Sequence, residues 1–245
     1  MRKVALILHG WPQHRAGGHF LSMFLKARGY KVITPDLFGR SFSFSPEAIH
    51  GEIKEELNNQ KPEAIIGVSL GGMLLPFIAK DYPESKLVFI ASGPYLKVRP
   101  ILFNFFIKAN KHQVVLNFAE RILKLPNWLL ALAYKLANPF NRNLEERKEY
   151  EEDMYRNIEF IKGIPVSKEI EIARFVIHAD TSEILKGLKN KALIFNGRRD
   201  LFMPAERGQE LHNLLKQSSL IVNEGEHFNS FTGKDLKAVG DFLQN

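Results

Sequence analysis

The chain has 245 residues, a length that suits one large α/β domain or two small ones and buries a sizeable core without disulfides or metals. It contains no cysteine, which excludes disulfides, thiolate metal sites and cysteine nucleophiles, and we expect a cytoplasmic location. The formal net charge of +7 comes from scattered basic residues without a nucleic-acid motif, so we expect no nucleic-acid partner. No apolar run reaches about eighteen residues, so we expect no stable membrane insertion.

Apolar runs bounded by turn residues predict strands in the first part of the chain. These strands are expected at residues 4–8, 31–35, 64–68 and 86–91. Helical spacing of apolar residues predicts helices at 20–28, 46–58 and 73–80. This alternation, with connections long enough for crossover helices, is typical of a parallel sheet covered on both faces.

From Pro94 to about Asp180 the alternation stops and the pattern becomes helical. Breakers divide this stretch into three or four helices, at Pro100, Pro126, Pro139 and Pro165. The alternation then resumes with strands at 191–196 and 219–222 and helices at 204–216 and 234–243. We therefore predict a discontinuous α/β core, residues 1–94 and 186–245, with a helical cap, residues 95–185, inserted between two strands.

A Gly-x-Ser-x-Gly pattern, Gly67-Val68-Ser69-Leu70-Gly71, lies between a predicted strand and a predicted helix. In a nucleophile elbow the turn is so tight that only glycine-sized neighbours fit, and the serine hydroxyl is exposed above the sheet. An ordinary glycine turn is the alternative. The strand before and the helix after it favour the elbow, with Ser69 as nucleophile.

An elbow serine needs a base, and the base needs an acid that fixes its tautomer. Asp200 follows the strand at 191–196, and His227 follows the strand at 219–222. The carboxyl ends of parallel strands meet at one edge of a sheet, where Ser69 also lies. Asp200 could instead be a cap for the helix that is predicted to begin at Pro204, and His227 could be an ordinary loop histidine. Their order and placement favour the catalytic roles.

Together these motifs resemble the α/β-hydrolase fold of the capped serine-hydrolase type, over nearly the whole chain and most weakly in the cap. The resemblance implies Ser69 as nucleophile, His227 as general base and then acid, and Asp200 as the orienting carboxylate. The turn His-Gly-Trp-Pro at residues 9–12 is similar to the family's oxyanion loop. That likeness implies that the backbone N–H groups of Trp11 and Leu70 hold the developing oxyanion.

Two features depart from the family pattern. The chain begins at the strand before His9, so the family's first two strands are missing and a sheet of about six strands is expected. The sequence His-Gly-Trp-Pro-Gln also resembles epoxide hydrolases and haloalkane dehalogenases, whose nucleophile is aspartate. Ser69 cannot form their ester intermediate, which disfavours both activities. We interpret His9 as structural and Asp36 and Ser41 as loop-shaping.

The function expected from these residues is a carboxylesterase that cleaves small-to-medium apolar esters through an acyl-serine intermediate. The same residues would serve a thioesterase or a carbon–carbon bond hydrolase, and an idle member of the fold would only bind a ligand. We expect no cofactor, no metal site, and a monomer or homodimer. The cap is expected to form an apolar pocket from Phe103, Phe105, Phe106, Leu125, Trp128, Leu129, Leu130, Tyr134 and Phe140. Its basic and aromatic helices would also permit docking on an anionic membrane, although nothing requires it.

Overall fold

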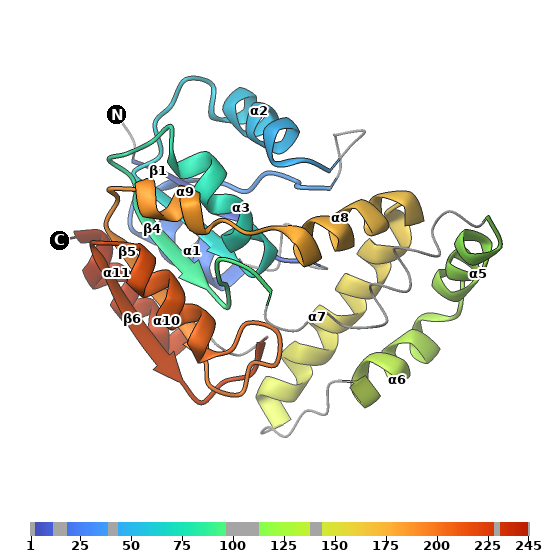
Figure 1. Ribbon diagram of the computed structural model, residues 1–245. Coiled ribbons are helices and arrows are strands. Elements are labelled where there is room, and N and C mark those ends of the chain that lie inside the picture. Colours follow the sequence, from blue (N-terminus) through green and yellow to red (C-terminus); the bar gives the residue numbers. More distant parts are fainter. Residues whose placement is uncertain are drawn as a thin grey trace.

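The computed structural model describes residues 3–11, 19–38, 44–96, 113–137, 144–227 and 231–244. Within them six strands form one sheet in the order β2-β1-β3-β4-β5-β6, and every neighbouring pair is parallel (Figure 1). The strands are β1 (Val4–Leu8), β2 (Lys31–Ile33), β3 (Ala64–Val68), β4 (Lys86–Ile90), β5 (Ala192–Gly197) and β6 (Ser218–Asn223). The prediction of a mostly parallel sheet of about six strands is confirmed.

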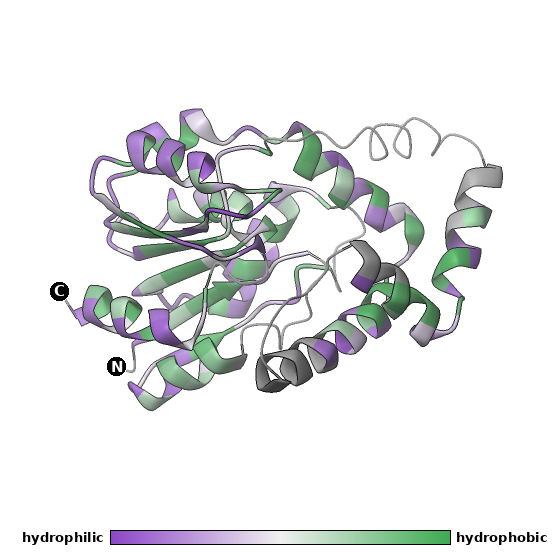
Figure 2. Cartoon of the chain, turned by 90° about the horizontal axis from the view of Figure 1, so that it is seen from below, coloured by the Kyte–Doolittle hydropathy of each residue, from purple (hydrophilic) through white to green (hydrophobic). Residues whose placement is uncertain are grey.

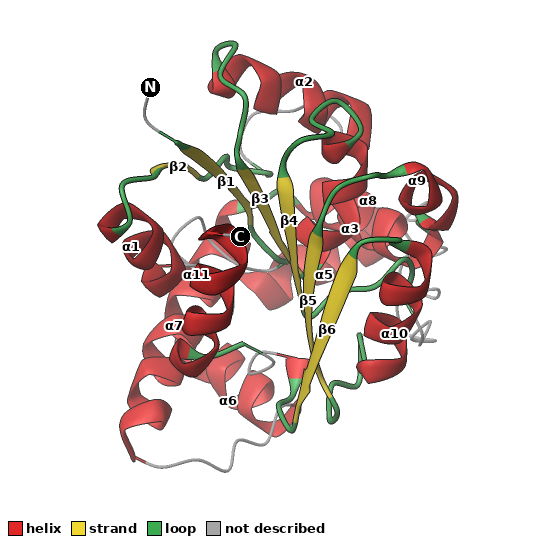
Figure 3. Cartoon of the chain, turned by 90° about the vertical axis from the view of Figure 1, so that its left-hand side faces the viewer, coloured by secondary structure: helices red, strands yellow, loops and turns green. Residues whose placement is uncertain are grey.

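Helices cover both faces of this sheet (Figure 3). One face packs against α1 (His19–Ala27) and α11 (Leu236–Gln244). The other packs against α2 (Pro46–Leu57), α3 (Leu70–Ala79), α9 (Ser182–Gly187) and α10 (Ala205–Leu214). In β1, Leu6 and Leu8 belong to the second layer and Ala5 and Ile7 to the first, because successive strand side chains point to opposite faces. The four inner strands, β1, β3, β4 and β5, are buried over almost their whole length, and the sheet is accordingly mostly hydrophobic in Figure 2.

Two element boundaries differ from the prediction. Helix α3 begins at Leu70, directly after Ser69, and not at residue 73. The glycines in this first turn gave no helical pattern in the sequence. A Cβ at Gly71 would collide with the carbonyl oxygen of Leu8, so glycine is the residue that lets α3 approach β1. Strand β2 ends at Ile33 and not at residue 35, since it pairs only with β1 and proline at 35 has no N–H to donate.

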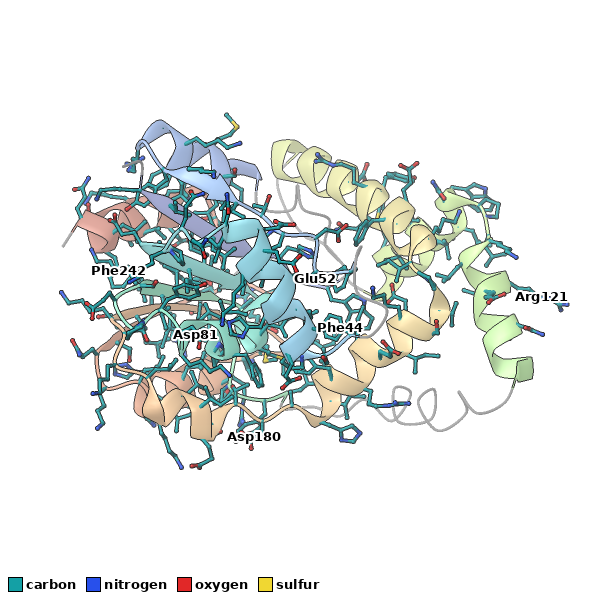
Figure 4. All side chains as sticks on the ribbon, turned by 90° about the horizontal axis from the view of Figure 1, so that it is seen from above. Phe44, Glu52, Asp81, Arg121, Asp180 and Phe242 are labelled. Carbon is teal, nitrogen blue, oxygen red and sulfur yellow. The ribbon has the colours of Figure 1, made fainter. Side chains whose placement is uncertain are left out.

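Four of the five described helices between β4 and β5 precede α9: α5 (Gln113–Leu123), α6 (Asn127–Ala137), α7 (Leu144–Gly163) and α8 (Val166–His178). We call them the helical insertion. Pro126 separates α5 from α6 and Pro165 separates α7 from α8, as the sequence predicted, whereas Pro100 and Pro139 lie outside the described residues. Helices α5 and α6 lie beyond α7, away from the sheet (Figure 1), and Arg121 projects from α5 at the outer side (Figure 4). The division of the chain at residues 95–185 remains a prediction.

Polar contacts fasten the last part of the insertion to loops of the α/β layers. The Nζ of Lys168 in α8 donates to the Phe38 carbonyl at 2.7 Å. Glu171 accepts a hydrogen bond from the backbone N–H of Phe44 at 2.8 Å, at the point where α2 approaches α8 (Figure 4). After α8, Thr181 donates from both its backbone and its hydroxyl to the Pro94 carbonyl. Helix α8 is therefore anchored at the edge where the strands end.

A helix that spans a membrane must be both long and apolar. None of the described helices is long and apolar enough to cross a bilayer.

Candidate active site

Ser69 occupies a strained turn between β3 and α3. Its backbone has φ 51° and ψ −114°, a left-handed φ that non-glycine residues adopt at a cost of about 1–3 kcal/mol. Two bonds hold the turn: Ser69 N–H donates to the Ile90 carbonyl at 2.8 Å, and Ser92 Oγ donates to the Ser69 carbonyl at 3.0 Å. A Cβ at Gly67 would lie 2.6 Å from the Gly71 oxygen, so the turn admits only glycine there. These are the features of the predicted elbow.

His227 connects Ser69 to Asp200. The Oγ of Ser69 lies 2.8 Å from His227 Nε2, and His227 Nδ1 lies 2.7 Å from Asp200 Oδ2. A carboxylate can only accept, so Nδ1 carries the imidazole proton and leaves Nε2 as the acceptor for the serine hydroxyl. The structure thus brings together the three side chains that the sequence singled out, each following a different strand.

The carboxylate of Asp200 is held by more than the histidine. Its side chain is buried, with the residue 2% exposed, and Oδ1 accepts from the backbone N–H groups of Phe202 and Met203, both at 2.8 Å. Helix α10 begins later, at Ala205, so Asp200 shapes the turn before the helix and does not cap its first residues. One oxygen is fixed by the backbone, which leaves the other directed at His227.

The loop after β1 lies beside the elbow, because β1 and β3 are neighbours with Leu8 opposite Gly67. His9 stabilises this loop: Leu37 N–H donates to its Nε2 at 3.1 Å, so its Nδ1 carries the proton and donates to the Gly10 carbonyl at 2.9 Å. This agrees with a structural role. Trp11 follows at the end of the described part of this loop.

The second proposed oxyanion donor is Leu70. As the first residue of α3 it has an N–H that the helix's own hydrogen-bonding pattern does not use. The loop after β2 also behaves as expected, since Asp36 Oδ1 accepts from the Phe38 N–H at 3.1 Å. Ser41 lies outside the described residues.

Glu169 is the residue near this loop that the sequence interpretation missed. It belongs to α8, is 9% exposed, and its Oε2 accepts from the indole Nε1 of Trp11 at 2.6 Å. Burial raises the pKa of Glu169 to about 7, and the bond from Trp11 opposes that rise. A signal existed, because Val166, Ile170 and Ala173 form the buried stripe of α8 and helical spacing places Glu169 in it.

We expect Glu169 to make stability fall as pH rises. The pKa of this carboxyl is higher in the folded state than in the unfolded state. Its contribution to the free energy of unfolding is therefore fully present below about pH 4.5 and is lost as the pH rises through about 7. Between pH 5.5 and 8 the loss amounts to about 2 kcal/mol of the free energy of unfolding. Urea unfolding at both pH values should show this loss in the wild type and a smaller one in Glu169→Gln. Equal losses in the two proteins would contradict the assignment.

The structure describes only some of the aromatic and leucine side chains that were expected to line a pocket. Trp128 is 63% exposed and faces solvent, as does Phe118 at 63%, so neither is packed within an interior pocket. Leu129 and Leu130 are half-buried. The remaining aromatic side chains of the pocket prediction lie outside the described ones: Phe103, Phe105, Phe106, Tyr134 and Phe140.

The chain is similar in sequence to a longer protein. Protein ABHD8 of Bos taurus is 23% identical over 214 residues, which are 81% of this chain and 46% of that protein. The chain therefore spans about half the length of the curated relatives it matches.

Several solved structures are similar over nearly the whole chain. A bromoperoxidase from Bacillus anthracis has a TM-score of 0.74 at 19% identity, covering 100% of this chain and 93% of its own. An enol-lactonase from Burkholderia xenovorans LB400 has 0.76 at 14%, covering 100% and 92%. The esterase EaEST from Exiguobacterium antarcticum has 0.67 at 18%, covering 99% and 89%. At such identities the likeness concerns the fold alone.

A protein-family model also matches most of the chain. A model described as the alpha/beta hydrolase fold matches residues 4–234, a span that runs from the first residue of β1 to the turn before α11. It includes all six strands, the elbow, and the loops that carry Asp200 and His227. The chain belongs to the alpha/beta hydrolase fold family.

Proposed function

We propose that this chain is a serine hydrolase that cleaves carboxylic esters through an acyl-Ser69 intermediate. The observation that carries the proposal is the continuous hydrogen-bonded series from Ser69 Oγ through His227 to Asp200, with distances of 2.8 and 2.7 Å. The first distance lies within the reach that proton transfer from a nucleophile to its base requires, and the second is that of a hydrogen bond that orients the base.

Acylation begins when Ser69 Oγ attacks the ester carbonyl carbon and its proton passes to His227 Nε2. Asp200 stabilises the imidazolium that forms. The carbonyl oxygen becomes an oxyanion, which the N–H groups of Trp11 and Leu70 are proposed to hold, each worth about 3–4 kcal/mol. Collapse of the intermediate breaks the bond to the alcohol, which takes the proton from Nε2 and leaves.

Deacylation uses the same groups in the reverse direction. His227 accepts a proton from water, the hydroxide attacks the acyl carbon, and the acid departs as Ser69 recovers its proton. A lactone is an internal ester, so the esterase and enol-lactonase of the same fold are named for reactions of this type. We propose small-to-medium, mostly apolar esters as substrates.

A fluorophosphonate probe tests the nucleophile directly. Phosphonylation requires an activated serine, so we expect one equivalent of probe on the peptide that contains Ser69, found by mass spectrometry, and no labelling after heat denaturation. Ser69→Ala should remain unlabelled. A folded wild-type sample that takes up no probe, or takes it up at another serine, would overturn the proposal.

A further inference from the structure

Glu169 is a buried acid that the proposed chemistry does not use. It is separated by 158 residues from Trp11, yet its Oε2 accepts the indole N–H at 2.6 Å. Its other oxygen, Oε1, is buried and has no hydrogen-bond partner among the residues that the structure describes. Leaving a buried polar atom unsatisfied costs free energy, and an apolar residue would fill this part of α8 without that cost. Packing alone therefore does not explain a carboxyl here.

The charged groups nearest to Glu169 along α8, and the histidine of the loop after β1, have identified contacts of their own. On α8, Lys168 donates to the Phe38 carbonyl and Glu171 accepts from the Phe44 N–H. On the loop after β1, the ring of His9 bonds to Gly10 and Leu37. The shift in the pKa of Glu169 arises from burial and from the opposing bond of Trp11. The indole is thus the group to which this carboxyl responds.

We propose that Glu169 is a positioning residue that holds Trp11, and with it the turn after β1, against helix α8. Its catalytic consequence rests on the proposed function, in which the backbone N–H of Trp11 binds the oxyanion. An oxyanion donor works only when it is held in place before the charge develops. The helical insertion would then fix the position of the Trp11 backbone N–H through the indole side chain, without contacting the reacting atoms.

The bond can be observed by fluorescence, independently of any reaction. The chain has two tryptophans, Trp11 and the exposed Trp128, so Trp128→Phe leaves Trp11 as the only indole. Its emission should change through a transition near pH 7 as Glu169 titrates. The transition should persist with Glu171→Gln, a matched change on the same helix, and disappear with Glu169→Gln. A transition that survives Glu169→Gln, or none in the Trp128→Phe protein, would overturn the proposal.

Kinetics test whether the bond serves the oxyanion site. Glu169→Leu removes the acceptor and should lower kcat for a nitrophenyl ester about ten- to a hundred-fold, less than loss of a whole donor, with KM nearly unchanged. Glu169→Gln keeps an acceptor oxygen and should retain most of kcat, and Glu171→Gln should be unaffected. Trp11→Phe removes the indole donor, so combining it with Glu169→Leu should cost no more than either change alone.

The possible failures can be told apart. If the wild type hydrolyses no ester, the proposed function fails, while the fluorescence titration still tests the bond. If the wild type is active and Glu169→Leu leaves kcat unchanged, or the two substitutions act additively, the function stands and the role of Glu169 is overturned.

Discussion

Ser69→Ala is expected to reduce nitrophenyl-ester turnover about a million-fold, to the residual rate that the proposed oxyanion donors and substrate binding support without a nucleophile. Alanine has no side-chain oxygen to attack the carbonyl, and the hydroxyl of the nearby Ser92 already donates to the carbonyl of residue 69. Alanine tolerates φ near 51° about as poorly as serine does, so the strain is the same in both proteins. We therefore expect the melting temperature to stay within about 3 °C of the wild type.

Ser218→Ala is the matched control for this experiment. The hydroxyl of Ser218 also lies close to a histidine nitrogen, 2.9 Å from His212 Nδ1, but Ser218 belongs to β6 and not to an elbow. Its removal should leave turnover and probe labelling unchanged. Turnover retained by purified Ser69→Ala would show that the reaction occurs at a different site or in a contaminant.

The sheet was predictable because each of its inner strands carries its own evidence. In β3, the residues from Ala64 to Gly67 are buried, so the strand appears in the sequence as an uninterrupted apolar run. Helix α3 was harder at its beginning, since Gly71 and Gly72 are poor helix formers in isolation. Contact with β1 and Ser92 requires glycine there, and tertiary contacts of this kind leave no local pattern.

The proposed catalytic residues could be predicted because the topology of a parallel sheet shows which distant parts of the sequence lie close together. Parallel strands end at one edge, so residues as distant in sequence as Ser69 and His227 can be expected together once the strands are recognised. Glu169 could not be found in this way, because its partner depends on how α8 docks on the loops. Its place in the apolar stripe indicated burial, but only the structure identifies Trp11 as its neighbour.

The same reasoning explains why the aromatic residues of the insertion do not by themselves identify a pocket. Amphipathic helices indicate that one face is covered, but not by what. Helix α8 buries its stripe against the α/β layers, whereas α6 contacts α7 and leaves Trp128 in solvent. For the proposed esterase, residues that select the substrate are therefore better sought around α8 than at the outer helices.

Asp200→Asn is expected to lower kcat about ten-thousand-fold, equivalent to about 5 kcal/mol of transition-state stabilisation. An asparagine oxygen can still accept from the N–H groups of Phe202 and Met203, so the turn should keep its shape. Its amide group would then point at His227 as a donor. Nδ1 would have to accept, which moves the imidazole proton to Nε2, and a protonated Nε2 cannot take the proton of Ser69. The tautomer changes while the fold remains.

Steady-state kinetics and the rate of fluorophosphonate labelling should fall together in Asp200→Asn, since both require the activated serine. Glu224→Gln is the control, because Glu224 follows the same strand as His227 but pairs with Arg198 at 2.9 Å and is exposed. It should retain full activity. If Asp200→Asn lost only a few-fold while Glu224→Gln or Glu226→Gln lost orders of magnitude, one of those glutamates would be the partner of His227. Asp200 would then serve only the turn before α10.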